Sequence, residues 1–315
     1  MGVAKILVAG SCVAGALAGA AVYRRYRREI LAAHERVAAG GRIIETERGP
    51  MEYERSGKGP AVLVLHGAAG GYDQGTLIGH QFFGAEFQVI APSRFGYLNS
   101  PVPQDSSLEA QADAYACLLD ALGIDRVTVV AFSAGGPSGL HFALRYPDRT
   151  AALVTASAIG YTDPADARAR ETEAAINRVI GSDFIYWFAI TYAPARVLDL
   201  FGVSREVREG LPPAEMAEAG QLMGAMLPMS CRLDGILLDQ KRDMPQDFPL
   251  GQVRAPTLVI HARDDSLVDY GHGQHIAAGI PGAEMMSLQD GGHLLLGHHD
   301  EIRSRIMTFF ERIKL

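Results

Sequence analysis

The chain has 315 residues, a formal net charge of −7 at pH 7 and a sequence pI of about 5.8. This acidic balance provides no basic footprint for nucleic acid, so we expect a small molecule as the ligand. The length is sufficient to bury one large core. The three cysteines, Cys12, Cys117 and Cys231, are widely spaced and form no Cys-x-x-Cys pair, which argues against a disulfide framework and a zinc site.

The first 28 residues predict a single-pass membrane anchor. Residues 6–23 are uncharged, mostly apolar and rich in alanine and glycine, and as a helix they approach the ~30 Å thickness of the hydrocarbon layer. Four arginines follow within residues 24–28, so the positive-inside rule places the rest of the chain on the cytoplasmic side. A cleaved signal peptide is the alternative, because Ala18-Gly19-Ala20 resembles a cleavage site, but signal peptides carry their charges before the apolar segment.

The segment after the anchor predicts a helical stalk over residues 29–41, ending at Gly40-Gly41. Residues 42–47 and 51–55 alternate like the strands of a hairpin joined by Gly49-Pro50. Apolar strands and helical stretches then alternate, with strands at 61–65, 88–91, 127–132 and 152–156 and an amphipathic helix at 108–122. This alternation predicts an α/β fold with a doubly wound, mostly parallel sheet and a site at its carboxyl edge.

Ser133 follows the strand at 127–132 and is flanked by small residues. Ala131 and Gly135, two residues before and two after it, leave room for the strained turn of a nucleophile elbow. Such a turn presents the serine hydroxyl at the carboxyl end of the strand, with the amide of Ala134 facing the position of an oxyanion. The same residues are also compatible with a helix N-cap or with a phosphate-binding turn.

Two later strands end near the base and the acid that a serine nucleophile needs. The run 256–261 is followed by Asp264 and Asp265, and the run 284–288 is followed by a Gly-Gly pair and His293. The chain order Ser, Asp, His is that of α/β-hydrolases and differs from the orders in chymotrypsin-like and subtilisin-like enzymes. The order therefore favours the elbow interpretation of Ser133.

Four further segments are typical of the same family: the His-Gly loop at 65–71, the loop at 92–97, residues 119–124 before the elbow strand, and residues 145–149 after the elbow helix. With these segments, residues 42–315 resemble a bacterial α/β-hydrolase. The resemblance implies that Ser133, Asp265 and His293 are catalytic. It also implies that the amides of Ala68 and Ala134 form an oxyanion hole.

The resemblance is incomplete at two positions. Ala131 replaces the first glycine of the G-x-S-x-G elbow motif, and Ser93 stands where many family members carry aspartate. Neither position has a triad role. Ala262 occupies the place of the family's strand-closing glycine, three residues before Asp265, so the resemblance selects Asp265 rather than Asp264 as the triad acid.

The other polar residues near these motifs have simpler interpretations. Asp264 is expected to be a solvated turn carboxylate that pairs with Arg263, and His66 is expected to orient the backbone of the oxyanion loop. The histidines of His298-His299-Asp300 and of the pair His272 and His275 lack a third ligand at a recognised spacing. We therefore expect no metal and no cofactor.

Residues 161–244 depart from the strand–helix alternation. Charged helical stretches surround the aromatic run 184–188 and a segment with four methionines, which resembles the cap that the family inserts before the acid loop. An apolar cap over the serine implies an apolar substrate pocket that excludes water. The predicted domains are thus the anchor at 1–28, the stalk at 29–41, a hydrolase core at 42–160 and 245–315, and the cap at 161–244.

The resemblance implies a serine hydrolase that cleaves a carboxylic ester of a small or medium apolar substrate through an acyl-enzyme. Serine at the elbow argues against epoxide hydrolase and haloalkane dehalogenase activity, because those relatives use aspartate there. Carbon-carbon bond hydrolysis of vinylogous diketones, by the same Ser, Asp and His, is a second hypothesis. A non-catalytic, membrane-anchored interaction protein on a hydrolase scaffold is a third.

Overall fold

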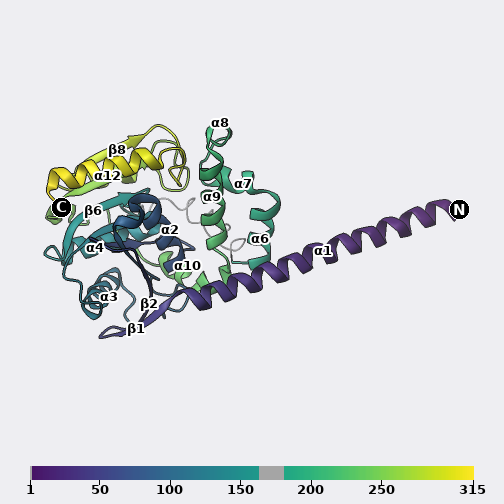
Figure 1. The fold of residues 1–315 in the computed structure, drawn as a ribbon, viewed down its shortest axis with the longest axis horizontal. Coiled ribbons are helices and arrows are strands. Elements are labelled where there is room, and N and C mark those ends of the chain that lie inside the picture. The colour runs from purple at the N-terminus through teal and green to yellow at the C-terminus, as the bar shows by residue number, and fades with distance from the viewer. Residues whose placement is uncertain (1, 163–180) are drawn as a thin grey trace.

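The computed structural model describes the backbone of residues 2–162 and 181–315, and the side chains from residue 17 onward within these ranges. Its centre is an eight-stranded sheet with the strand order β1-β2-β4-β3-β5-β6-β7-β8 (Figure 1). The strands are β1 (Arg42–Thr46), β2 (Gly49–Ser56), β3 (Ala61–Leu65), β4 (Gln88–Pro92), β5 (Val127–Phe132), β6 (Thr150–Ala156), β7 (Thr257–Ala262) and β8 (Glu284–Leu288). β2 is antiparallel to β1 and β4, and the remaining neighbours are parallel. The predicted α/β fold with a mostly parallel sheet is confirmed.

Helices cover both faces of the sheet because its central strands are apolar on both sides. On β3, Leu63 and Leu65 belong to one core and Val62 and Val64 to the other, as the period of a strand requires. The first core includes residues of α3 (Leu108–Ala121), α4 (Gly136–Arg145) and α11 (Tyr270–Gly279), and the second includes residues of α2 (Tyr72–Phe83) and α12 (His299–Ile313). The sheet is therefore doubly wound.

Among the described residues, five α-helices lie between β6 and β7: α6 (Asp183–Tyr192), α7 (Pro194–Leu200), α8 (Arg205–Gly210), α9 (Pro213–Ala225) and α10 (Leu233–Asp239). We call residues 181–239 the insertion. Short 3-10 helices are η1 (Gly84–Glu86), η2 (Ser133–Gly135), η3 (Met229–Arg232) and η4 (Leu250–Gln252). Figure 1 shows α6 to α9 grouped beside the sheet. The insertion falls within the predicted cap, while residues 163–180 of that cap lie outside the described residues, and the exact domain boundaries stay predictions.

The N-terminal segment is one continuous helix, α1 (Gly2–Gly40), which includes the predicted anchor and most of the predicted stalk. Figure 1 shows α1 extending away from the rest of the chain. Its C-terminal part packs on the insertion: Ile30, Ala33 and Val37 are buried, and Trp187 Nε1 donates to Glu29 Oε2 at 2.8 Å. The end of α1 is thus part of the folded body rather than a free stalk.

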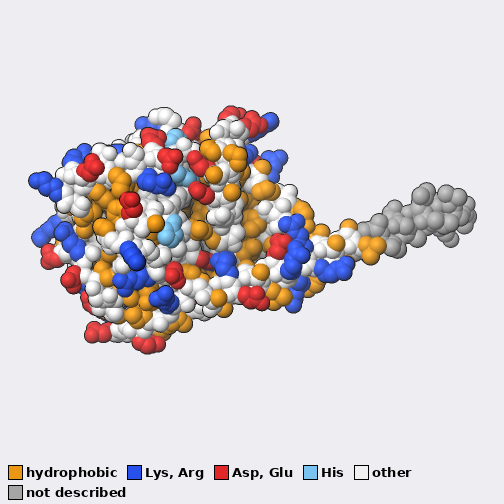
Figure 2. Space-filling model, viewed as in Figure 1, with side chains coloured by type: hydrophobic (Ala, Val, Ile, Leu, Met, Phe, Trp, Pro, Cys, Tyr) orange, Lys and Arg blue, Asp and Glu red, His pale blue; other side chains and the backbone are white. Residues whose placement is uncertain are grey.

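The predicted single-pass anchor is wrong. Across the part of the chain that the structure describes, no helix combines the length and the apolar character that crossing a bilayer requires. The described side chains of α1 include four arginines within residues 24–28, and Figure 2 shows basic side chains gathered on α1 where it leaves the body. Among the described side chains only residues 17–23 of the apolar stretch precede these arginines, which is too few to cross the ~30 Å hydrocarbon layer. The cytoplasmic placement, which depends on the anchor, is withdrawn with it.

The first hairpin is present, but its turn differs from the prediction. Thr46 pairs with Gly49, so Glu47 and Arg48 form the turn and Gly49-Pro50 begins β2. Thr46 Oγ1 accepts from the Arg48 amide at 3.1 Å and donates to the Gly49 carbonyl at 2.7 Å. Gly49 has a φ of 99°, a conformation that favours glycine. Gly49 is therefore the residue that follows the turn, and it is not one of the two central turn residues.

Candidate active site

Ser133 lies in the sharp turn between β5 and α4. Its φ of 52° is in the left-handed region, which is strained for a residue with a side chain. A Cβ on Gly135 would lie 2.4 Å from the carbonyl oxygen of Leu65, so only glycine fits there. The backbone therefore has the geometry that the elbow interpretation requires.

Ala131, the departure from the family's elbow motif, is accommodated by a second glycine. A Cβ on Gly139, one turn into α4, would lie 2.6 Å from the Ala131 Cβ. Real Cβ atoms do not approach this closely, so position 139 must be glycine when position 131 is alanine. The space that the family's glycine would leave at position 131 is provided here by Gly139. The methyl group of Ala131 thus fits without displacing α4 from β5.

The structure brings Ser133, His293 and Asp265 together at the carboxyl edge of the sheet. They follow β5, β8 and β7, respectively. Ser133 Oγ lies 2.8 Å from His293 Nε2, and His293 Nδ1 lies 2.8 Å from Asp265 Oδ2. All three side chains are buried. Both distances are within hydrogen-bond range, so an unbroken line of hydrogen bonds joins the hydroxyl to the carboxylate.

The Asp265 carboxylate is held in its ionised form. Its Oδ1 accepts from the amides of Leu267 and Val268, each at 2.9 Å. Burial alone would raise the pKa of Asp265, but the charge of His293 and the hydrogen bonds from His261, His293 and the Val268 amide lower it well below its usual range. The carboxylate can therefore fix the imidazole of His293 and stabilise its protonated form.

His261 is a further residue of this site, which sequence reasoning missed. It lies on β7, is fully buried, and places Nε2 2.9 Å from the Val268 carbonyl and 3.3 Å from Asp265 Oδ2. Because the carbonyl can only accept, Nε2 carries a hydrogen, which is directed at both oxygens. A histidine inside an otherwise apolar strand, four residues before the acid, is the signal that could have identified it.

Asp264 is not the solvated turn carboxylate that the sequence predicts. It accepts from the amide of Gly292 at 2.9 Å, which joins the loop after β7 to the residue before His293. Burial raises the pKa of Asp264. Arg263, its expected partner, instead lies with its guanidinium carbon 4.7 Å from the centre of the Tyr270 ring. Asp264 therefore positions the loop that carries His293.

The loop after β3 approaches Ser133 closely. A Cβ on Gly67 would lie 2.9 Å from the Ser133 Cβ, and Ala68 follows directly. His66 Nε2 accepts from the Arg94 amide at 3.0 Å, so its hydrogen lies on Nδ1, 2.7 Å from the Gly67 carbonyl. Burial lowers the pKa of His66 well below its usual value, which keeps the ring neutral. His66 thus orients the backbone of this loop, as its position in the sequence predicts.

Arg94 ties the same loop to the insertion. Its Nε donates to the His66 carbonyl at 3.0 Å, and its two terminal nitrogens contact the Asp239 carboxylate at 2.6 and 2.7 Å. Tyr97 adds a hydrogen bond to Asp239 at 2.6 Å. A paired carboxylate offsets the cost of burying Arg94, which is 1% exposed. The loop after β3 is therefore fixed from the end of α10.

A second buried arginine makes a similar connection. Arg232 Nη1 donates to the Gly70 carbonyl at 2.6 Å, and Nη2 contacts Asp73 Oδ2 at 2.7 Å. Arg36 of α1 contacts the same carboxylate oxygen at 2.5 Å. One carboxylate of α2 thus joins the N-terminal helix, the insertion and the loop beside Ser133.

The histidines considered as metal candidates have other neighbours. His298 Nε2 lies 2.8 Å from Asp290, and His272 stacks on Tyr161 with ring centres 4.2 Å apart. No group of three or more potential ligands is arranged for a metal ion within residues 17–162 and 181–315.

The comparisons with known proteins agree with this geometry. A family model described as the alpha/beta hydrolase fold matches residues 60–300. An uncharacterised hydrolase of Bacillus subtilis is 29% identical over 274 residues, which cover 81% of this chain and 93% of the relative. A 2-hydroxy-6-oxo-6-phenylhexa-2,4-dienoate hydrolase of Burkholderia cepacia is 26% identical over 266 residues, which cover 81% of this chain and 88% of that enzyme.

Solved structures share the fold. An α/β-hydrolase fold protein from Nakamurella multipartita superimposes with a TM-score of 0.65 at 26% identity, covering 86% of this chain and 98% of that one. A thermophilic esterase from Thermogutta terrifontis gives a TM-score of 0.66 at 21% identity, covering 87% and 99%. Both superpositions leave out more than a tenth of this chain and almost none of the other.

Proposed function

The chain belongs to the α/β-hydrolase fold family and is an enzyme of the hydrolase type, and from this premise we propose that it cleaves a carboxylic ester of a small or medium apolar substrate. In this proposal Ser133 is the nucleophile, His293 the general base and Asp265 the orienting acid. The amides of Ala68 and Ala134 form the oxyanion hole. The proposal is supported most strongly by the line of hydrogen bonds from Ser133 Oγ through His293 to Asp265.

In the proposed reaction, Ser133 Oγ attacks the ester carbonyl carbon while His293 Nε2 takes the hydroxyl proton. The carbonyl oxygen becomes an oxyanion, which the amides of Ala68 and Ala134 stabilise. His293 then gives the proton to the leaving alcohol, and the acyl group remains on Ser133. A water molecule deprotonated by His293 attacks the acyl-enzyme, which releases the carboxylic acid and restores the serine hydroxyl.

An apolar substrate is supported by the surroundings of the base. The ring of Phe132 lies 5.3 Å from the His293 ring, and the ring of Phe201, from the insertion, lies 6.3 Å from it. The Phe201 carbonyl also accepts from the His293 amide at 2.8 Å. Apolar walls exclude water, which strengthens electrostatic contacts to a developing oxyanion.

Carbon-carbon bond hydrolysis of a vinylogous diketone is the second candidate. The Burkholderia cepacia relative, whose name describes the hydrolysis of a phenyl-substituted dienoate, favours it. The same serine, histidine and aspartate would serve this reaction. The third hypothesis, a non-catalytic protein held at the membrane, is not retained, because the chain is a hydrolase and its predicted anchor is wrong.

Fluorophosphonate labelling tests the nucleophile directly. We expect the wild-type protein to be labelled on Ser133 and the Ser133→Ala variant not to be labelled. Ser138→Ala is the matched control, because Ser138 is another buried serine a few residues along α4, and its hydroxyl donates to the Gly135 carbonyl. Full labelling of Ser133→Ala would contradict the proposal.

A substrate panel then separates the two reactions. Nitrophenyl esters of graded acyl length are compared with a 6-aryl-2-hydroxy-6-oxohexa-2,4-dienoate, using the same enzyme preparation. Turnover of esters with little or no dienoate cleavage supports the ester hydrolase, and the reverse ranking selects the second candidate.

A further inference from the structure

A short segment of the insertion, residues 200–203, contacts both the loop after β7 and the loop that carries His293. The Phe201 carbonyl accepts from the His293 amide at 2.8 Å. The Leu200 carbonyl accepts from the hydroxyl of Ser266 at 3.3 Å. Ser266 is the residue directly after the proposed acid. The insertion is therefore hydrogen-bonded to the loops of both the proposed acid and the proposed base.

The segment provides these acceptors because it is the C-terminal end of α7. The last carbonyls of a helix have no amide partner within the helix. At this end the Gly202 amide donates to the Asp199 carbonyl at 3.1 Å, and the Val203 amide donates to the Leu198 carbonyl at 3.0 Å. This pair of hydrogen bonds is a Schellman motif. The two carbonyls between them along the chain accept from the two triad loops instead.

Gly202 packs directly on the loop of the proposed acid. A Cβ on Gly202 would lie 2.7 Å from the Asp264 carbonyl oxygen and 3.0 Å from the Ser266 amide nitrogen. Its φ of 74° also favours glycine. The absence of a side chain thus lets the backbone of the insertion touch the residues on both sides of Asp265.

Gly292 makes the matching contact from the loop of the proposed base. A Cβ on Gly292 would lie 2.5 Å from the Phe201 carbonyl oxygen and 2.7 Å from the Gly202 carbonyl carbon. The Gly292 amide donates to the Asp264 carboxylate at 2.9 Å. Three backbone segments therefore meet here, and a hydrogen bond joins each pair of them. A displacement of the insertion at this point moves the loop that carries His293.

The position of His293 matters because both of its ring nitrogens are in use. One lies 2.8 Å from Ser133 Oγ and the other 2.8 Å from Asp265 Oδ2. The Phe201 ring is inclined by only 24° to the imidazole, with ring centres 6.3 Å apart. The same residue of the insertion thus holds the backbone of His293 and lies beside its ring.

We propose that residues 200–203 are positioning residues, which hold His293 in line with Ser133 and Asp265. The insertion then acts on the rate of the reaction itself, in addition to any contact with the substrate. This inference rests on the proposed roles of the three triad residues.

Gly202→Ala tests the inference, because its methyl group pushes the loop after β7 away from the insertion. We expect kcat for nitrophenyl acetate to fall about tenfold to a hundredfold, since a misplacement of about 1 Å can cost about a hundredfold in rate. KM is expected to stay within about threefold. Nitrophenyl esters with longer acyl chains should lose the same factor in kcat, and fluorophosphonate labelling of Ser133 should slow equally. A segment that only binds substrate would instead change KM, and by an amount that depends on acyl length.

Gly282→Ala is the matched control. Gly282 is exposed, lies in the turn before β8 and has a φ of 73°, but a Cβ there would meet no described atom within 4 Å. The substitution therefore introduces the same backbone strain without a contact to a triad loop. We expect it to lower Tm as Gly202→Ala does, while kcat and the labelling rate stay within about twofold of the wild type.

Histidine ¹⁵N resonances provide a readout that needs no substrate. The ring signals of His293 are identified by their loss in His293→Gln. We expect them to shift in Gly202→Ala and to stay at the wild-type position in Gly282→Ala. A wild-type protein that is neither labelled nor active on esters would contradict the proposed function, and these resonances would still show whether Gly202 positions His293.

Three results would overturn the inference: wild-type kcat and labelling rate in Gly202→Ala, a change confined to KM, or unmoved His293 resonances. If Gly202→Ala does not fold, the exposed Ser266 decides the question. Ser266→Ala removes the hydrogen bond to the Leu200 carbonyl and should lower kcat about threefold, while Ser266→Thr keeps the hydroxyl and should keep the wild-type kcat. Equal kcat values in these two variants and the wild type would then reject the inference.

Discussion

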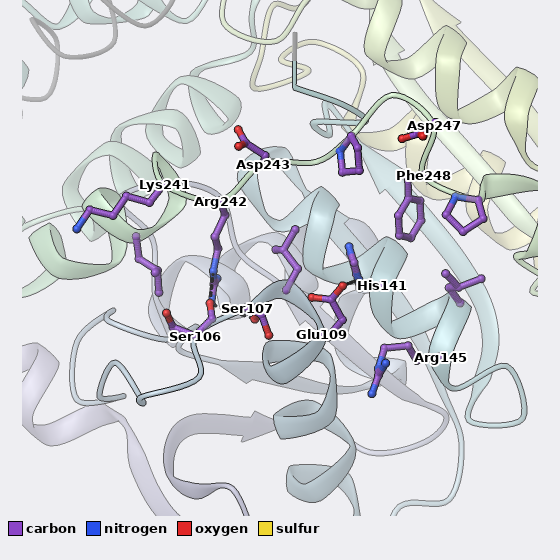
Figure 3. A pocket seen from close by; sticks show the side chains of 15 residues that line it. Ser106, Ser107, Glu109, His141, Arg145, Lys241, Arg242, Asp243, Asp247 and Phe248 are labelled. Atoms are coloured by element: carbon purple, nitrogen blue, oxygen red, sulfur yellow. Dashed lines mark hydrogen bonds and ion pairs between the residues drawn. The ribbon is translucent and has the colours of Figure 1, made fainter. Parts of the chain in front are cut away.

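Helix α4 has contrasting surroundings at its two ends. At its start, Ser133 joins His293 and Asp265 in one line of hydrogen bonds, and further donors hold the carboxylate. Toward its C-terminus, His141 is buried against Phe248 (Figure 3), and its Nε2 has no hydrogen-bond partner within the described part of the chain. A network that is complete before substrate arrives is preorganised for chemistry. A buried polar group without a partner instead lowers the stability of the fold.

The largest effect is expected from Ser133→Ala, which removes the proposed nucleophile at the start of α4. Ser133→Ala should keep the fold but lower kcat by about 10⁶, as loss of a triad serine does in other hydrolases. Ester turnover under saturating substrate gives kcat, and the thermal midpoint gives the fold. Substantial turnover by a well-folded Ser133→Ala protein would break the comparison, because the hydrogen-bonded line would then have no chemical role.

Asp265→Asn should lower kcat by about 10⁴, because asparagine cannot fix the imidazole of His293 in the required tautomer. Asp264→Asn is the matched control and should have a mild effect, since an amide oxygen can still accept from Gly292. The kinetics of the two variants are measured side by side. A larger loss of kcat in Asp264→Asn than in Asp265→Asn would show that Asp264, rather than Asp265, is the acid.

The lowered pKa of Asp265 also predicts a pH dependence of stability. The carboxyl has a lower pKa folded than unfolded, so its ionised form stabilises the fold above about pH 4 and this contribution is lost as the pH falls below that value. The free energy of unfolding of the wild type, relative to Asp265→Asn, should therefore decrease from about pH 5 to pH 3. Denaturant titrations across this range measure it, and a difference that stays constant would contradict the assigned shift.

His261 offers a sharper test of preorganisation. His261→Asn removes the Nε2 donor and should lower kcat by about tenfold to a hundredfold, because a hydrogen bond to a charged group is lost, while KM stays near the wild-type value. His261→Gln carries an amide nitrogen near the Nε2 position and should recover most of the loss. Equal losses in both variants would indicate a role in packing alone.

The smallest effect is expected in the middle of α4. Gly139→Ala adds a methyl group whose Cβ would lie 2.6 Å from that of Ala131, so it should destabilise the protein by about 1–3 kcal/mol. Adding Ala131→Gly should restore most of this loss. Denaturant unfolding of the two single variants and the double variant measures the coupling, and additive effects would show that the two residues do not share this space.

The sequence predicts most of the fold because buried strands leave a strong local pattern. Runs such as 61–65 and 127–132 are apolar and end abruptly, and the small residues around Ser133 mark the elbow. The order of Ser133, Asp265 and His293 along the chain predicts their meeting at one sheet edge, because parallel strands share a carboxyl end.

Contacts between distant segments could not be predicted in the same way. His261 belongs to the site because the loop after β7 folds back and brings the Val268 carbonyl to its Nε2. Arg94 can be buried because Asp239, which lies far away in the sequence, binds its guanidinium. Local composition also does not reveal that the end of α1 packs on the insertion. The predicted anchor failed for a different reason, because no helix of the described residues is long and apolar enough to cross a bilayer.

The hydrogen bonds to Asp73 limit where a substrate could enter. Arg36 and Arg232 both bind this buried carboxylate, and Arg232 also holds the Gly70 carbonyl. The insertion therefore cannot swing outward at this corner without breaking charged hydrogen bonds. An entrance for substrate at this corner would require those hydrogen bonds to break. Any rearrangement that does reach Arg232 is transmitted directly to the loop beside Ser133.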